Sequence, residues 1–205
     1  MTVEPLYVAG TGTFAAEVAG WAAEAGNEIA GLIELEDATR VGSEIHGLAV
    51  VALEGPPEGA HAVLGTGGDR RARSELLAGA GWSPAGLVHP RAHLAATARV
   101  AGTATIGPMA VVGAEAAIGE QVVLSRGVLV GHHARIGEFA TLNPGVNVGG
   151  NARIGAGAFL GMGCVVANAV QVGEEATVAA GAVSVREVSP GIRVQGVPAV
   201  PYEGP

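Results

Sequence analysis

Two adjacent histidines, His132 and His133, are the side chains in this sequence best suited to proton transfer. An imidazole can take a proton near neutral pH, as an amine or hydroxyl requires when it attacks a carbonyl carbon. A lone histidine is more often an exposed turn residue. Whether either ring is a general base therefore depends on what the fold places around it.

A second candidate site is the segment Gly10–Thr13, which reads Gly-Thr-Gly-Thr. It follows a short apolar stretch and precedes a helical pattern, a place where backbone N–H groups can hold a phosphate. The segment is not a full dinucleotide-binding fingerprint, so by itself it is a weak signal.

The elements that must position these residues are clearest in the second half of the chain. From residue 88 to residue 183 an apolar pattern recurs with a period of six. The fifth position of each hexad is always Ala, Val or Cys, and the second is usually Gly or Ala. The first position is always Val, Ile or Leu, in the order Val88, Leu94, Val100, Ile106, Val112, Ile118, Leu124, Val130, Ile136, Leu142, Val148, Ile154, Leu160, Val166, Val172 and Val178.

An α-helix cannot hold this pattern, because six residues are not a whole number of 3.6-residue turns. A short strand followed by a corner at every sixth residue can, with the aliphatic residue always pointing inward. Aromatic residues make up only 3% of the chain and glycine contributes 34 residues, which also favours a narrow, repetitive interior. The second half is therefore predicted to be a parallel β-helix.

The first part of the chain has a different pattern. Strands are expected at 6–9, 29–35, 48–53 and 61–65, and helices at 13–25 and 69–80. Strands that alternate with helices predict a small α/β domain with a parallel sheet. We therefore expect two domains, residues 1–86 and residues 87–205.

Composition excludes several classes of protein. The net charge of −8 argues against a nucleic-acid partner, which would need a basic stripe. No apolar run reaches about 18 residues and no basic-then-apolar leader opens the chain, so neither membrane spanning nor secretion is expected. The single Cys164 excludes an internal disulfide and favours a cytoplasmic location; its inward hexad position predicts an inert thiol.

The repeat resembles that of the hexapeptide-repeat, or left-handed β-helix, transferases. From Leu6 to Ala199 the chain is similar to a narrower group, the sialic-acid and bacillosamine-type sugar O/N-acyltransferases, which place a small Rossmann-like domain before the β-helix. The similarity rests on Gly10–Val18, on Gly131–Phe139, and on Asn143–Gly145 followed by Gly149–Asn151. The resemblance implies three hexads per coil, a homotrimer, acetyl-CoA as co-substrate and a nucleotide-linked amino sugar as acceptor.

With three hexads per coil, residues eighteen apart lie above one another, about 4.8 Å apart. His132 then lies between Ala114 and Gly150, whose small size would leave space beside the ring. The resemblance implies that His132 is the general base and that the Gly150 N–H stabilises the oxyanion. The family usually has Glu after the histidine; here it is His133, and Glu115 is a displaced substitute at best.

The resemblance also implies binding residues. The acetyl-CoA slot is expected at Thr141, Gly150, Met162 and Ala180. The acceptor is expected at Gly10, Gly12, Thr13, Phe14, Glu34, Leu35 and Gly65. Two of these positions depart from the family, which commonly has His where this chain has Phe14 and an acidic pair where it has Glu34 and Leu35.

A zinc site is one alternative, because γ-class carbonic anhydrases share the predicted fold and bind zinc through three histidines. His132 and His133 lie in the middle coils, whereas His89 and His93 lie at the first coil, so no third ligand is near. We expect no metal. The expected reaction is acetyl transfer to an amine of a nucleotide-linked amino sugar. O-acetylation, a non-nucleotide acceptor, and a non-catalytic β-helix that serves as an assembly or ligand-sensing subunit are the alternatives.

Overall fold

The computed structural model describes residues 5–202, and the chain divides between Pro90 and Arg91 into two compact units. The sequence placed the boundary after residue 86. The residues just beyond that point belong to the first unit, since His89 is buried there and its Nε2 lies 3.0 Å from the Glu24 Oε2.

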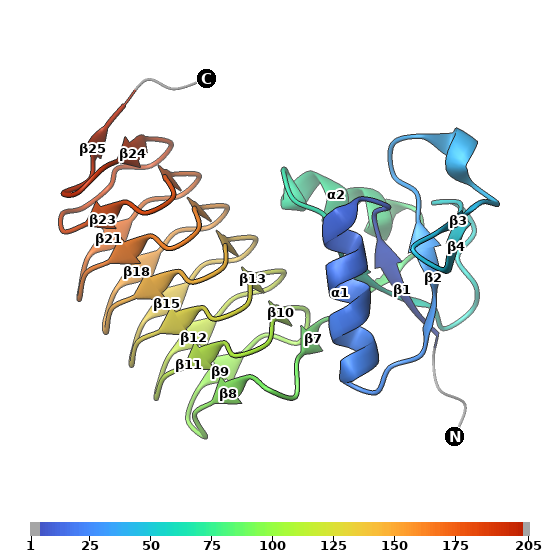
Figure 1. The fold of residues 1–205 in the computed structure, drawn as a ribbon, viewed down its shortest axis with the longest axis horizontal. Coiled ribbons are helices and arrows are strands. Elements are labelled where there is room, and N and C mark those ends of the chain that lie inside the picture. The colour runs from blue at the N-terminus through green and yellow to red at the C-terminus, as the bar shows by residue number, and fades with distance from the viewer. Residues whose placement is uncertain (1–4, 203–205) are drawn as a thin grey trace. The chain divides into compact units, whose positions relative to one another are not determined.

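The first unit is a sheet with one helix on each face (Figure 1). Its elements are β1 (Leu6–Ala9), α1 (Thr13–Glu24), β2 (Ile29–Ile33), a 3₁₀ turn (Ala38–Arg40), β3 (Glu44–Ile45), β4 (Leu48–Val51), β5 (His61–Leu64), α2 (Arg70–Gly79), β6 (Ser83–Pro84) and β7 (Leu87–Val88). The sheet order is β3-β4-β2-β1-β5-β6, and only β3 runs antiparallel to its neighbour. The predicted parallel sheet is confirmed, whereas the antiparallel edge was not foreseen.

Alternation along β1 explains why the helices lie on opposite faces. Leu6 and Val8 pack with α1, while Tyr7 and Ala9 pack with the cluster that includes Leu77 of α2. Successive side chains of a strand point to opposite sides, so a strand that is apolar throughout must be covered on both faces.

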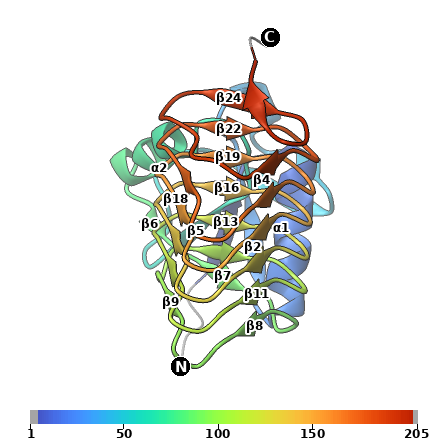
Figure 2. The ribbon, with the colours of Figure 1, turned by 90° about the vertical axis from the view of Figure 1, so that its left-hand side faces the viewer.

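The second unit is a parallel β-solenoid whose stacked rungs are seen in Figure 2. One face, the β16 face, contains β10 (Thr105–Ile106), β13 (Val123–Leu124), β16 (Thr141–Leu142), β19 (Phe159–Leu160), β22 (Thr177–Val178), β24 (Arg193–Gln195) and β25 (Val200–Pro201). The β14 face contains β8 (His93–Leu94), β11 (Val111–Val112), β14 (Leu129–Val130), β17 (Asn147–Val148), β20 (Val165–Val166) and β23 (Val183–Ser184). The β15 face contains β9 (Arg99–Val100), β12 (Ala117–Ile118), β15 (Arg135–Ile136), β18 (Arg153–Ile154) and β21 (Gln171–Val172).

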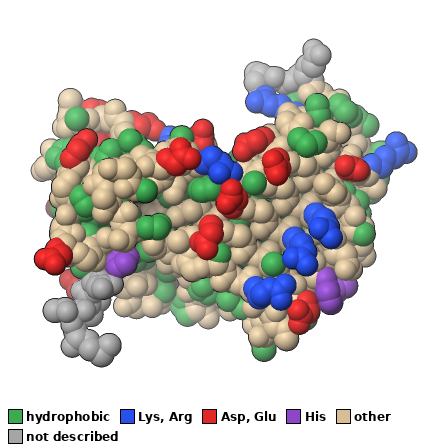
Figure 3. All heavy atoms as spheres, turned by 180° about the vertical axis from the view of Figure 1, so that it is seen from behind, with side chains coloured by type: hydrophobic (Ala, Val, Ile, Leu, Met, Phe, Trp, Pro, Cys, Tyr) green, Lys and Arg blue, Asp and Glu red, His purple; other side chains and the backbone are tan. Residues whose placement is uncertain are grey.

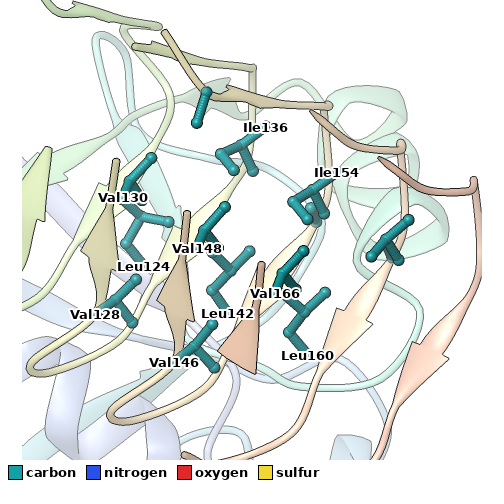
Figure 4. Packing of buried hydrophobic residues seen from close by; sticks show 14 of the residues in the cluster. Leu124, Val128, Val130, Ile136, Leu142, Val146, Val148, Ile154, Leu160 and Val166 are labelled. Carbon is teal, nitrogen blue, oxygen red and sulfur yellow. The ribbon is translucent and has the colours of Figure 1, made fainter. Parts of the chain in front are cut away.

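Fifteen of the sixteen aliphatic residues of the period-six pattern end one of these two-residue strands, and the sixteenth, Val88, ends β7, so the predicted β-helix is confirmed. Pairing joins residues eighteen apart, for example Leu124 with Leu142 and Val130 with Val148. Figure 4 shows the resulting stacks of like residues inside the solenoid. The core is filled by aliphatic ladders and by the small fifth residues of the hexads.

Two corners of the solenoid matter for the site. The histidine corner (residues 131–134, 149–152 and 167–170) lies between the β14 face and the β15 face. The methionine corner (residues 143–146, 161–164 and 179–182) lies between the β16 face and the β14 face. The two corners are therefore the two edges of the β14 face.

Candidate active site

The histidine corner stacks His132, Gly150 and Asn168 on successive coils. Backbone hydrogen bonds hold the stack. The Asn151 N–H donates to the His132 carbonyl and the Ala169 N–H to the Gly150 carbonyl, each at 2.9 Å. The corner is thus a backbone-bonded ladder in which the His132 side chain faces the next coil and the Asn168 side chain faces the preceding one.

His132 packs directly against Gly150. A Cβ on Gly150 would lie 2.7 Å from Nε2 and 2.8 Å from Cε1 of the His132 ring. The sequence predicted open space beside the imidazole; in the structure the ring itself fills the space that the glycine leaves. Gly150 is therefore a steric requirement for this position of the ring.

His132 also contacts its neighbour. The Nδ1 atoms of His132 and His133 lie 3.2 Å apart, and the two rings are nearly perpendicular, at 84°. Two Nδ1 atoms can share a hydrogen bond only when one carries a proton and the other does not. His133 reaches this position from a left-handed backbone, with φ at 60°.

Glu115 points to a different partner. Its carboxylate lies 3.6 Å from the Arg99 guanidinium, in an exposed ion pair. The side chain that contacts the His132 Nδ1 is thus the His133 ring. Glu115 instead forms its ion pair with Arg99 of the β15 face.

The Gly150 N–H, expected to stabilise an oxyanion, donates to the Oδ1 of Asn168 at 2.9 Å. Asn168 is not among the residues that the sequence predicted for the site. Its signal was available, because Asn168 lies eighteen residues after Gly150 and so occupies the same column.

The residues expected around acetyl-CoA lie at both edges of the β14 face. Met162, which is 59% exposed, and the exposed Ala180 are on the methionine corner, and Thr141 is on the adjoining strand β16. Gly150 is on the histidine corner. Within one chain these positions therefore lie at two different edges of the solenoid.

The β15 face carries a basic row, visible as adjacent arginines in Figure 3. Arg135 and Arg153 are directly opposite in the pairing of β15 with β18. They line a groove of about 690 Å³ together with Gln171 and Glu174. These two arginines, eighteen residues apart in the sequence, therefore form a basic row on this face.

The first unit contains a pocket of about 290 Å³ at the carboxyl ends of β1, β2 and β5. It is lined by all seven residues expected to bind the acceptor: Gly10, Gly12, Thr13, Phe14, Glu34, Leu35 and Gly65. Arg40 and Arg73, which the sequence did not single out, line it as well.

Glu34 is already fully hydrogen-bonded. Its Oε1 accepts the backbone N–H groups of Leu35, Glu36 and Asp37 at 3.0, 2.9 and 3.1 Å, and its Oε2 accepts the Thr11 hydroxyl at 2.8 Å. Burial acts to raise the pKa of this carboxyl, but these hydrogen bonds, with that from Glu36 first, outweigh it and hold the pKa below its ordinary value. Glu34 thus organises the loop after β2.

Two further pocket residues have packing roles. Phe14 makes an edge-to-face contact with Trp21, with ring centroids 5.9 Å apart. A Cβ on Gly65 would lie 2.4 Å from Val8 and 2.9 Å from the Ala15 backbone, so only glycine lets β5 end this close to β1 and α1.

Cys164 is buried in the solenoid core, and burial raises the pKa of its thiol to about 12. Among residues 5–202, no three His, Cys, Asp or Glu side chains gather closely enough to hold a metal ion. No helix in this part of the chain is long and apolar enough to cross a membrane.

Among known proteins, one family matches the second unit, and several solved structures match nearly the whole chain. Residues 88–197 match the family described as the GMPPB C-terminal domain. Among curated proteins none matches. Solved structures are similar over nearly the whole length. The acetyltransferase domain of PglB from Neisseria gonorrhoeae is 28% identical with a TM-score of 0.88, over 98% of this chain and 100% of that one.

Two further structures share the fold. PerB from Caulobacter crescentus, solved with CoA and GDP-perosamine, is 24% identical with a TM-score of 0.86, over 98% of this chain and 99% of that one. WeeI from Acinetobacter baumannii is 21% identical with a TM-score of 0.88, over 97% and 99% of the two chains. The resemblance inferred from the hexads is confirmed: through residues 88–197 the chain belongs to the GMPPB C-terminal domain family, and it is an acyltransferase of the hexapeptide-repeat, left-handed β-helix type.

Proposed function

We propose that the protein transfers an acetyl group from acetyl-CoA to the amine of a nucleotide-linked amino sugar, in the cytoplasm. The observation that carries this proposal is the His132 ring packed on Gly150 at the edge of the β14 face. Support also comes from the PglB acetyltransferase domain, similar over the whole chain and also solved with acetyl coenzyme A.

We propose that the first unit is a Rossmann-like domain that binds the nucleotide part of the acceptor. Its strand order β4-β2-β1-β5 reverses direction at β1, and ligands of such sheets bind at the carboxyl ends of the strands beside that reversal. The 290 Å³ pocket lies at those strand ends. The bound GDP-perosamine of PerB is consistent with this type of acceptor.

In the proposed reaction the acceptor nitrogen attacks the thioester carbonyl carbon while the His132 Nε2 takes its proton. The carbonyl π electron pair moves to oxygen and then re-forms the C=O bond as the carbon–sulfur bond breaks, and the CoA sulfur leaves with the electron pair of the carbon–sulfur bond. His133 orients the base: when the His132 Nδ1 carries the proton shared with His133, the lone pair is on Nε2, beside Gly150. The buried Cys164 takes no part.

The active protein is proposed to be a homotrimer. The expected acetyl-CoA contacts lie on the methionine corner and the expected base on the histidine corner, at opposite edges of one face. If three copies turn their β14 faces toward a common axis, the histidine corner of each copy meets the methionine corner of the next. Leu129 and Val111, apolar and 43% and 38% exposed, are on that face and would be buried there.

The test is mass analysis of reactions that contain acetyl-CoA and a panel of amino sugars, free or linked to UDP, GDP or dTDP. The proposal predicts one added acetyl group on the nitrogen of a nucleotide-linked sugar and one CoA released for each product. An O-acetylated product or an acetylated free sugar would favour the alternative acceptors, which the hydrogen-bonded Glu34 and the packed Phe14 make worth testing. A protein that neither binds acetyl-CoA in calorimetry nor transfers acetyl would contradict the proposal.

A further inference from the structure

Asn168 adds a hydrogen-bond donor to the histidine corner. Its Oδ1 accepts the Gly150 N–H at 2.9 Å. A backbone N–H can only donate, so the atom that faces it must be the amide oxygen and not the amide nitrogen. The orientation of the carboxamide is therefore determined, and its NH₂ group points away from Gly150. Among residues 5–202, no group accepts a hydrogen bond from that NH₂.

The same glycine is approached from the preceding coil by His132. The Nε2 of His132 lies 2.7 Å from where a Gly150 Cβ would stand. The imidazole and the carboxamide thus approach Gly150 from the coils on either side of it. A proton acceptor and a hydrogen-bond donor thus lie together on an exposed corner.

We propose that Asn168 is a catalytic residue whose Nδ2 donates a hydrogen bond to the thioester carbonyl oxygen of acetyl-CoA. This inference rests on the proposed function. As the acceptor nitrogen bonds to the carbonyl carbon and loses its proton to His132, the carbonyl electron pair moves to oxygen, and Asn168 stabilises that negative charge. When the C=O bond re-forms, the carbon–sulfur bond breaks and CoA leaves as the thiolate, which carries the negative charge.

In this arrangement Gly150 does not stabilise the oxyanion through its N–H, as the sequence predicted. Its N–H is occupied by the Asn168 carbonyl, and so it holds the carboxamide in place. The absence of a side chain at Gly150 leaves room for the imidazole beside it, and in the proposal both groups act on the same thioester.

The deciding comparison is between Asn168→Asp and Asn168→Ala. The N168D variant keeps an oxygen that can accept the Gly150 N–H but has no NH₂ donor, whereas N168A loses both. The proposal predicts that both variants lower kcat by about 100- to 1,000-fold, the loss typical of one oxyanion donor. Because N168D also adds a negative charge to the histidine corner, kcat is compared at the plateau of each pH–rate profile.

Gln171→Glu is the matched control, because it makes the same chemical change at an exposed site on the β15 face and should keep wild-type kcat. Gel filtration and thermal unfolding show that each variant is folded. An N168D variant that retains wild-type kcat would overturn the role of Asn168 while leaving the proposed function standing. A wild-type protein that transfers no acetyl group would contradict both.

Discussion

His132 and Gly150 touch, and this contact governs what the histidine corner tolerates at the scale of single residues. Gly150 does not have a left-handed backbone, so alanine can adopt its conformation. The new methyl group would stand 2.7 Å from the His132 Nε2 and would displace the ring. We therefore predict that Gly150→Ala lowers kcat by about 10- to 100-fold, as a small misplacement of a catalytic group does.

Steady-state kinetics with circular dichroism measures this effect. Gly102→Ala is the control, because a Cβ at Gly102 meets nothing within 4 Å, and this variant should match the wild type. If Gly150→Ala were as active as Gly102→Ala, the ring position seen here would not be the working one.

His133 provides a second prediction at this scale. Asparagine tolerates the left-handed backbone of His133 and offers an amide oxygen that can accept a hydrogen bond from the His132 Nδ1–H, whereas alanine offers no acceptor. We predict that His133→Ala lowers kcat by at least about tenfold and that His133→Asn retains most of it. Equal kcat values for the two variants would contradict an orienting role.

At the scale of elements, the hexads predicted every strand from β7 to β22, because the period leaves one residue in six no place but the interior. The contacts at the corner were harder to predict. The spacing placed Gly150 beside His132, but it did not say that the ring would fill the gap or that Asn168 would accept the Gly150 N–H. Those depend on side-chain rotamers, which a repeat pattern does not determine.

In the first unit, too, the longer elements were predicted and the shorter ones were not. Alternating apolar segments predicted strands β1, β2, β4 and β5 and both helices within a few residues, but not the two-residue parallel strand β6. The edge strand β3 is only two residues long, and the 3₁₀ turn before it is organised by the side chain of Asp37, which accepts the Thr39 N–H. Such short elements lack enough residues to show a period.

The loop after β2 leads to a prediction on pH. The pKa of Glu34 is lower in the folded chain than its ordinary value, so its carboxylate stabilises the fold fully above about pH 4.3. That stabilisation is lost as pH falls through the folded pKa. Glu34→Gln should therefore be less stable by about 1–3 kcal/mol at pH 7, and the difference should shrink on acidification below about pH 4.

Urea unfolding followed by tryptophan fluorescence measures this directly, because both tryptophans, Trp21 and Trp82, are in the first unit. The exposed Glu28→Gln is the control and should change little at any pH. If the difference in unfolding free energy between wild type and Glu34→Gln stayed constant from pH 7 to pH 3, the stabilising role of the Glu34 carboxylate would be refuted.

At the scale of the whole molecule, the proposed trimer brings together two corners that one chain holds apart. Leu129→Glu would place a charge on the β14 face, where burial against another copy is costly. We predict that light scattering gives three times the chain mass for the wild type and a single chain mass for this variant, with acetyl transfer lost. Gln171→Glu on the β15 face should remain trimeric. A trimeric, active Leu129→Glu protein would show that copies meet elsewhere.

The central claim is that an imidazole at this corner takes the proton of the acceptor. The most direct test is the kcat of acetyl transfer by purified His132→Ala, compared with wild type of the same oligomeric mass. Loss of a general base predicts a fall of about 100- to 10,000-fold with the fold and assembly retained. Acetyl transfer at the wild-type rate by a correctly assembled His132→Ala protein would contradict the account.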